Sequence, residues 1–356
     1  MNDSFQRLMS DAASLTRSGD LRAATAAIQA GLAGTSASLF AAVDDTAVIE
    51  GEAREIKADG PHIARPVAAT GEFIAGSYAD AAGTLDYKLF IPPGNAGQAL
   101  PLVLMLHGCT QSPDDFALGT DMNERARTQG FFVLYPAQTQ GANPSRCWNW
   151  FKRSHQQRDL GEPAALANMT RDVIRHHNID PTRVYVAGLS AGGAMAAILG
   201  DAYPDLFAAV GVHSGLPTGS ARDVQSAFAV MKGGAASAQI RSEPDAASHR
   251  TPPTIVFHGD QDKTVHPGNG EQVVAASVGT VVPQVDRVRS DNGRDYTRRI
   301  YREADGLVMA EYWAVHGAGH AWSGGSAKGS YTDAKGPSAT DEMLRFFFEN
   351  TLRTVS

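Results

Sequence analysis

The stretch RVYVAGLSAGGAMAAIL, residues 183–199, decides the fold. Its first residues, 183–187, form a short apolar run, and this predicts a buried strand. The residues after Ser190 are small and rich in alanine, which predicts the start of a helix. Gly188 and Gly192 flank the serine in the pattern G-x-S-x-G. Flanking glycines let neighbouring chains clear a tight turn, so the sequence predicts Ser190 at a strand-to-helix turn.

A serine at such a turn has two uses. The strained turn lifts the hydroxyl above the sheet, and the N-terminus of the next helix favours developing negative charge. Ser190 would then be a nucleophile. The alternative is an ordinary N-cap, in which the side chain satisfies a free helix amide. We expect the nucleophile, because the glycine pattern and the strand–helix setting coincide.

Strands and helices alternate on both sides of this stretch. Two opening antiparallel strands are expected at 71–79 and 84–93. Six further strands are expected at 102–108, 131–137, 183–190, 207–215, 254–260 and 309–317. Five of them are near-continuous apolar runs, typical of strands buried on both faces. Helices are expected near 116–129, 162–176, 191–203, 270–277 and 341–352. This alternation predicts an α/β fold, a mostly parallel sheet with helices on both faces.

The first residues have a different pattern. Apolar residues recur at helical spacing on either side of Gly19-Asp20, at positions 5, 8, 9, 12 and 15 and then at 21, 24, 27 and 28. We expect a helical hairpin over 1–33, a linker over 34–69 and the strand–helix domain over 70–356. The hairpin has two candidate roles, docking on that domain or contact with a partner such as a second copy of the chain.

The composition excludes several classes of protein. With 356 residues, 43% hydrophobic and 19% charged, the chain suits a folded globular protein. A net charge of −7 argues against nucleic acid or an anionic membrane as a partner. No apolar run of about 18 residues occurs, so no membrane span is expected. Charged residues interrupt every candidate leader near the start. We therefore expect a cytoplasmic protein, with a secreted chain whose leader was removed as the alternative.

A serine nucleophile needs a base, and the base an acid. Asp260 and Asp262 compete for the acid after the strand at 254–260, and we favour Asp262. Asp260 is expected to bond within its own turn. His316 and His320 compete for the base after the last apolar strand, and we favour His320 because glycines precede it. No glutamate follows His316, so a zinc motif is excluded and no metal is expected.

An acyl-transfer site also needs fixed donors for an oxyanion. One is expected to be the N–H of Ala191, directly after the nucleophile. The other comes from the loop after an earlier strand, where Cys109 follows Gly108. Three further histidines lie at strand ends, and we expect structural roles for His107, His213 and His258.

Six motifs in order give a family resemblance: LPLVLMLHGCTQ (100–111), FFVLYPAQ (131–138), RCWNWF (146–151), RVYVAGLSAGGAMAAIL (183–199), HGDQDKTV (258–265) and GAGHAWSGG (317–325). The chain resembles esterases of the poly(3-hydroxybutyrate) depolymerase type, which are similar to feruloyl and acetylxylan esterases. The resemblance covers residues 70 to 352. It implies an α/β-hydrolase fold and a serine esterase without metal or cofactor, with Ser190, Asp262 and His320 as the triad.

The substrate is the less determined part of this expectation. Secreted depolymerases usually carry a signal peptide and a separate substrate-binding domain, neither of which is visible here. We therefore expect soluble esters or short hydroxyalkanoate oligoesters rather than a solid polymer. Feruloyl or acetylxylan esters, a thioester or a peptide are the alternatives on this fold, and an inactive binding protein is a remote one.

The motif RCWNWF holds Cys147, Trp148 and Trp150 and follows a strand expected beside the one that ends near Cys109. Both loops then face the edge that carries Ser190. A Cys109–Cys147 disulfide and two free thiols remain equally open. We expect at least one of the two tryptophans, opposite Trp322, to form an apolar wall for the substrate.

Overall fold

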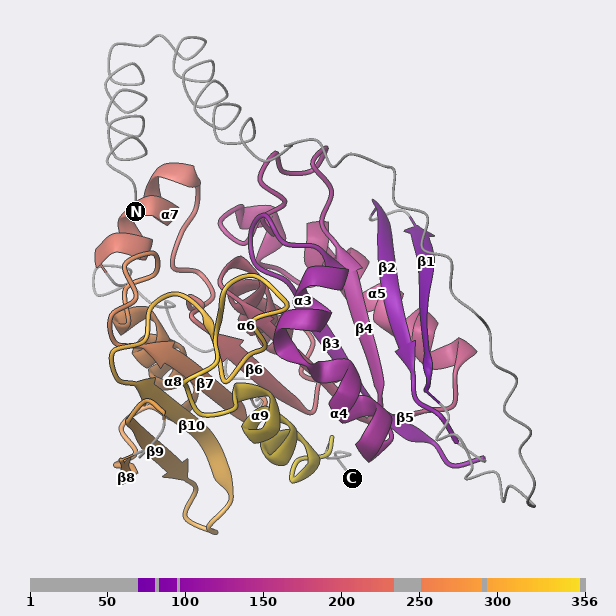
Figure 1. The fold of residues 1–356 in the computed structure, drawn as a ribbon. Coiled ribbons are helices and arrows are strands. Elements are labelled where there is room, and N and C mark those ends of the chain that lie inside the picture. The colour runs from indigo at the N-terminus through magenta and orange to yellow at the C-terminus, as the bar shows by residue number, and fades with distance from the viewer. Residues whose placement is uncertain (1–69, 81–82, 95–96, 234–250, 290–292, 353–356) are drawn as a thin grey trace, which may run out of the picture. The chain divides into compact units, whose positions relative to one another are not determined.

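The centre of the protein is a mixed sheet with the strand order β1-β2-β4-β3-β5-β6-β7-β10-β9-β8 (Figure 1). Of these strands, the six from β4 to β10 in this order are parallel. β1 and β2 add antiparallel strands at one edge, and β9 and β8 at the other. The strands are β1 Glu72–Asp80, β2 Gly83–Ile91, β3 Leu100–Leu106, β4 Phe132–Ala137, β5 Ile179–Leu189, β6 Ala209–His213, β7 Thr254–Gly259, β8 Gln284–Val288, β9 Tyr296–Arg302 and β10 Val308–Val315.

This computed structural model describes residues 70–80, 83–94, 97–233, 251–289 and 293–352, which all belong to one compact unit. The expected hairpin over 1–33 lies outside the described residues, as does the expected linker over 34–69. Both therefore stay predictions.

Helices cover both faces of the sheet. Along β3, Leu102 and Leu104 belong to one hydrophobic cluster and Val103 and Met105 to another, because successive side chains point to opposite faces. Helices α5, α6 and α8 complete the first cluster, and α3, α4 and α9 the second. The helices are α3 Pro113–Thr120, α4 Met122–Gln129, α5 Gly161–His176, α6 Ala191–Ala202, α7 Val224–Gly233, α8 Gly268–Val278 and α9 Ala339–Phe348. The α/β architecture expected from the sequence is confirmed.

Some elements differ from expectation, among them helix α7, which was not expected from the sequence. The single helix expected near 116–129 is broken at Asp121, whose φ of 55° ends α3 and begins α4. Strands β8 and β9 were not expected, because their sequences QVDRV and YTRRIYR are too charged for a buried strand. Antiparallel edge strands tolerate such residues, and Arg298 of β9 pairs with Asp286 of β8 at 2.9 Å.

The register of the parallel strands lines up their carboxyl ends. Leu106 of β3 pairs with Gly188 of β5, and Leu189 pairs with His213 of β6. Farther along, β7 and β10 stay paired up to their last residues, Gly259 and Val315. The loops after these strands therefore meet along one edge, where sites form in open α/β sheets.

Candidate active site

Ser190 lies at the turn between β5 and α6 with φ 58° and ψ −117°. Holding a non-glycine residue there costs about 1–3 kcal/mol. The turn is fixed by a hydrogen bond of 2.8 Å from the Ser190 N–H to the His213 carbonyl. Gly192 lies so close to the Leu106 carbonyl that a Cβ atom would clash. The Ser190 side chain makes no cap hydrogen bond to α6, so the turn is not an ordinary N-cap.

An imidazole and a carboxylate meet at the same edge. Nδ1 of His320, in the loop after β10, lies 2.7 Å from Oδ2 of Asp262, in the loop after β7. The Asp262 side chain is buried and His320 is largely buried. The second oxygen, Oδ1, accepts the N–H groups of Thr264 and Val265 at 2.8 and 2.9 Å. This carboxylate is therefore held in one orientation and presents one oxygen to the imidazole.

The Asp262 carboxylate stays charged although it is buried. Burial raises its pKa, but hydrogen bonds from His258 and His320 outweigh this effect and hold the pKa below its usual range. His258 Nε2 lies 3.4 Å from Asp262 Oδ2 and 2.9 Å from the Val265 carbonyl. A fixed negative charge at this position stabilises a protonated His320.

The two competing residues form a second pair. Asp260 Oδ2 lies 2.9 Å from His316 Nδ1, and Oδ1 accepts the Gly317 N–H at 2.8 Å. The expectation that Asp260 bonds within its own turn does not include these two partners, which lie in the neighbouring loop after β10. His316 Nε2 lies 2.9 Å from Thr297 Oγ1. Both ring nitrogens of His316 are thus engaged away from Ser190.

His213 connects the serine turn to the loop that carries His320. Its carbonyl accepts the Ser190 N–H, and its ring Nε2 accepts the Ser323 N–H at 2.9 Å. Because Nε2 accepts, the ring proton lies on Nδ1, 3.1 Å from Ser214 Oγ. Burial holds the pKa of His213 well below its usual range, so the ring stays neutral.

The loop after β3 lies beside the serine turn. A Cβ atom on Gly108 would lie 3.5 Å from the carbonyl of Leu189, the residue before Ser190. Gly108 N–H donates to Gln111 Oε1 at 2.9 Å, and Thr110 N–H to the Ser145 carbonyl at 2.7 Å. Within the described part of the chain, no hydrogen bond uses the Cys109 N–H. That amide is free to donate to a substrate.

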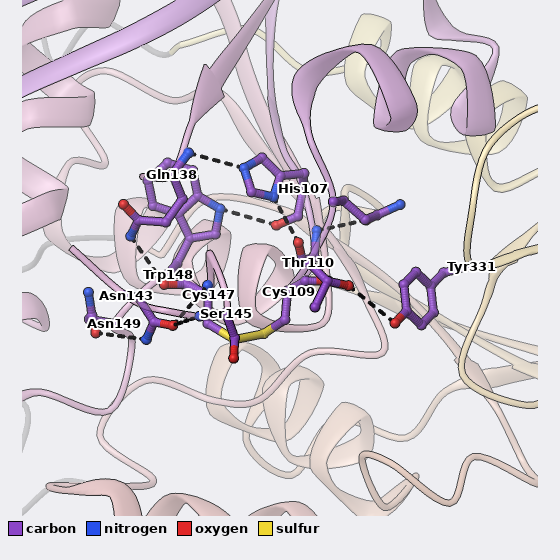
Figure 2. Close-up of a disulfide and its surroundings, with 12 residues drawn as sticks. His107, Cys109, Thr110, Gln138, Asn143, Ser145, Cys147, Trp148, Asn149 and Tyr331 are labelled. Carbon is purple, nitrogen blue, oxygen red and sulfur yellow. Dashed lines mark hydrogen bonds between the residues drawn. A yellow bond between two sulfur atoms is a disulfide. The ribbon is translucent and has the colours of Figure 1, made fainter. Parts of the chain in front are cut away.

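A disulfide joins Cys109 to Cys147 (Figure 2). It links the loop after β3 to the RCWNWF loop across 38 positions of sequence, with the Cα atoms 4.2 Å apart. Of the two states that the sequence left open, the structure contains the bonded one. The residue that carries the free Cys109 N–H is therefore covalently tied to a second loop.

The three tryptophans expected as a substrate wall are buried. Trp148, Trp150 and Trp322 have exposed fractions of 0%, 5% and 1%. Trp148 Nε1 donates to the His107 carbonyl at 3.1 Å, and Trp322 stacks on His213 with ring centres 5.1 Å apart. A role for any of them as an apolar wall for the substrate stays a prediction. These large side chains fill the core beneath the site.

Two residues near the site were not singled out from the sequence. Tyr331 is 47% exposed, has φ 52°, and its hydroxyl lies 3.3 Å from Thr110 Oγ1, next to Cys109 (Figure 2). Glu162, in the first turn of α5, is buried beneath the RCWNWF loop and accepts the Asn149 N–H at 2.7 Å. The sequence gives little signal for either residue, because the exposure of Tyr331 and the long-range contacts of Glu162 arise only in the folded protein.

Neither a metal cluster nor a membrane helix is found in the described ranges. No group of three or more histidine, cysteine, aspartate or glutamate side chains there is arranged to hold a metal ion. No helix among these residues is long and apolar enough to cross a membrane.

Comparison with known proteins gives evidence on the family of this chain that does not depend on the geometry of the site. Residues 85–286 match the family model described as esterase PHB depolymerase. The poly(3-hydroxyalkanoate) depolymerase C of Paucimonas lemoignei is 33% identical over 246 residues, 67% of this chain and 58% of that protein. The feruloyl esterase B of Thermothelomyces thermophilus is 28% identical over 235 residues, 62% of this chain and 78% of that protein.

A solved structure agrees in fold. The acetyl xylan esterase from Aspergillus awamori superposes with a TM-score of 0.60 at 19% identity, covering 77% of this chain and 99% of that one.

The poly(3-hydroxybutyrate) depolymerase of Ralstonia pickettii is 29% identical over 272 residues, 72% of this chain. This chain spans only 58% and 55% of the two depolymerases. Because the family model covers more than half of the chain, the protein belongs to the esterase family of the PHB depolymerase type.

Proposed function

We propose that this protein is a serine hydrolase of carboxylic esters that works through an acyl-enzyme. The observation that carries the proposal is the buried Asp262–His320 pair, with 2.7 Å between Oδ2 and Nδ1, on the sheet edge that also carries the strained Ser190 turn. A strained serine, a histidine and a buried carboxylate are the parts that acyl transfer needs. The described residues offer the competing Asp260–His316 pair no free ring nitrogen for a serine.

The reaction has two halves. In the first, His320 Nε2 takes the Ser190 proton as Oγ bonds to the ester carbonyl carbon, and the N–H groups of Ala191 and Cys109 stabilise the oxyanion. The imidazolium then protonates the departing alcohol, and the acyl group stays on Ser190. In the second half, His320 takes a proton from water, which attacks the acyl carbon, and the acid leaves as Ser190 regains its proton. Asp262 keeps the ring proton on Nδ1 throughout.

For the substrate we propose short hydroxyalkanoate oligoesters. The depolymerase relatives support this choice. Tyr331 supports a substrate with an apolar chain. Its exposed aromatic ring lies beside the loop that carries Cys109 and offers such a chain a contact surface. The Thermothelomyces relative is a feruloyl esterase, which makes aromatic esters the second class to test.

The experiment is a matched panel. Initial rates are measured on 3-hydroxybutyrate dimer and trimer esters, p-nitrophenyl butyrate, methyl ferulate, an acetylated xylo-oligosaccharide, and a thioester and an amide of butyrate. The proposal expects the highest kcat/KM on the oligoesters and a very slow amide reaction. Preference for methyl ferulate or the acetylated sugar would overturn the substrate class, and preference for the thioester or amide would overturn the ester class.

Residues 70–356 form the catalytic domain in this proposal, with the hairpin over 1–33 as a contact for a second copy of the chain. The Cys109–Cys147 disulfide supports work in an oxidising compartment rather than the cytoplasm expected from the sequence, because cytosolic thiols are kept reduced. Light scattering of the full chain and of residues 70–356 tests the hairpin. An unchanged oligomeric state would remove that role.

A further inference from the structure

His107 lies directly before the loop that carries the proposed oxyanion donor, and its ring has one proton arrangement. The ring is 1% exposed, and Nε2 accepts the Gln138 N–H at 3.1 Å. A nitrogen that accepts carries no proton, so the ring proton lies on Nδ1. Nδ1 lies 2.7 Å from the Gly108 carbonyl oxygen and therefore donates to it, and it is the nearer of two donors, since the Gln111 N–H reaches the same oxygen at 3.3 Å. Figure 2 shows both contacts. Burial lowers the pKa of His107 to about 4, so this neutral form is the one present at neutral pH.

The Gly108 carbonyl belongs to the same peptide unit as the Cys109 N–H. In a planar trans peptide these two groups point in opposite directions, and no cis peptide occurs in the described chain. Fixing the Gly108 oxygen therefore fixes the direction of the Cys109 N–H. The amides on either side, of Gly108 and Thr110, are already bonded within the protein. Among the amides of Gly108, Cys109 and Thr110, the one without a partner in the described chain is thus the one whose peptide His107 holds.

The buried carboxylate of Glu162 holds Gln138, the residue whose N–H donates to the His107 ring. Glu162 Oε1 accepts the Gln138 side-chain amide at 2.7 Å, and that amide also donates to the Cys147 carbonyl at 3.1 Å. Glu162 Oε2 accepts the Asn149 N–H at 2.7 Å. Burial raises the pKa of Glu162, but the His155 ring, with Nδ1 3.4 Å from Oε2, and hydrogen bonds from Asn149 outweigh this effect and keep the pKa below its usual range. A charged acceptor makes strong hydrogen bonds in such surroundings, so Gln138 is held firmly.

We propose that His107 is a positioning residue that aims the Cys109 N–H at the oxyanion, and that Glu162 anchors this arrangement through Gln138. The inference rests on the proposed function, because an aimed donor matters only where an oxyanion forms. The disulfide restrains the Cys109 side chain, whereas His107 restrains the rotation of the peptide itself. The two restraints therefore act on different degrees of freedom.

The test begins with His107→Phe, which keeps a ring of similar size and removes both hydrogen bonds. Removal of an oxyanion donor costs about 10²–10³ in kcat, so for a misaimed donor we expect kcat on p-nitrophenyl butyrate to fall by at most about that factor, with KM within about threefold. His107→Gln keeps one donor and one acceptor and is expected to recover part of the loss. Thr170→Val is the matched control, because it removes a buried 2.7 Å hydrogen bond to the Leu166 carbonyl in α5. Its kcat is expected to stay at the wild-type value.

An inhibitor readout separates aiming from general loosening. An alkyl trifluoromethyl ketone adds to Ser190 as a hemiketal whose oxygen occupies the oxyanion position. We expect His107→Phe to weaken its binding by the same factor as kcat/KM and to raise the hemiketal pKa measured by ¹⁹F NMR. The parent methyl ketone, which binds without an oxyanion, should bind as in the wild type.

The outcomes distinguish failure of the inference from failure of the proposed function. Folded His107→Phe with wild-type kcat, or equal weakening of both ketones, overturns the inference. If His107→Phe does not fold, Glu162→Gln replaces it, because the glutamine amide has one acceptor oxygen where the carboxylate has two. A several-fold loss of trifluoromethyl ketone affinity then supports the inference and an unchanged affinity overturns it. Failure of the wild type to form any hemiketal would instead overturn the proposed function.

Discussion

Asp262 Oδ2 lies 2.7 Å from His320 Nδ1, and the two residues are 58 positions apart in the sequence. The parallel pairing of β7 and β10 brings them together, because each residue lies in the loop after one of these strands. Gly259 lies so close to the Ala318 carbonyl that a side chain there would clash. The same two loops also carry the Asp260–His316 pair. Two Asp–His pairs on neighbouring loops allow a comparison within one molecule.

Asp262→Asn is expected to lower kcat on p-nitrophenyl butyrate by about 10³–10⁴ with little change in KM. The amide cannot stabilise the imidazolium, and its NH₂ group favours the wrong tautomer of His320. Single-turnover and steady-state kinetics give the two values, and circular dichroism establishes that the variant is folded. A loss smaller than about tenfold would contradict the acid role.

Asp260→Asn is the matched control for that variant. It makes the same chemical change two residues away, in the more exposed pair with His316. Exposed ion pairs contribute about 0–1 kcal/mol, so both stability and kcat should stay near wild type. A larger loss of kcat here than in Asp262→Asn would exchange the two assignments.

Removal of the disulfide by Cys109→Ser with Cys147→Ser is expected to lower both stability and kcat. Closing a loop of 38 positions stabilises the folded state by about 3–4 kcal/mol in the chain-entropy estimate. The kcat falls because the restraint on the Cys109 residue is lost, although its N–H remains. Denaturant unfolding and kinetics measure both effects, and the same protein under reducing agent is the chemical counterpart. Unchanged stability in both would contradict the bond.

Stability is expected to fall as the pH decreases from about 6.5 to about 4. The pKa of His107 is lowered from 6.5 to about 4 in the folded protein, so in this window the unfolded chain binds a proton that the folded chain does not. The free energy of unfolding then decreases by roughly 3 kcal/mol as the pH falls through the window. Urea unfolding at several pH values measures the slope. The His107→Phe variant should show a flatter one, and an equal or steeper slope in that variant would contradict the assignment.

Tyr331→Ala is expected to raise KM for an oligoester about fivefold, the loss of roughly 1 kcal/mol of aromatic contact. The kcat for p-nitrophenyl acetate, which is too short to reach Tyr331, should be unaffected. Tyr331→Phe separates the ring from its hydroxyl contact with Thr110. Val282→Ala, at another exposed apolar residue, is the control. Equal KM values for all three variants would remove Tyr331 from the substrate path.

The positions of the candidate site residues could be predicted from the sequence because they depend on local patterns. The Ser190 turn requires Gly188 and Gly192 at fixed positions, and the parallel sheet brings the ends of successive strands to one edge. The order of Ser190, Asp262 and His320 along the chain then suffices to place the three on that edge. These features follow from backbone geometry, which requires particular residue types at fixed positions of the sequence.

Side-chain burial and distant pairing could not be predicted in the same way. Trp148 lies in a loop and Trp322 in the two-residue strand β11 (Trp322–Ser323), yet both side chains are buried, and the sequence does not record that direction. Asp260 finds its partner His316 across 56 positions. The role of His107 depends on one ring proton, which is set by the backbone amide of Gln138. Long-range contacts of this kind require the fold itself.

Covalent labelling shows whether Ser190 is the nucleophile. The protein is treated with a fluorophosphonate, and its mass is measured before and after digestion. We expect one adduct on the peptide that contains Ser190, and no adduct in Ser190→Ala under the same conditions. An adduct on another residue, or an unchanged extent of labelling in Ser190→Ala, would contradict it.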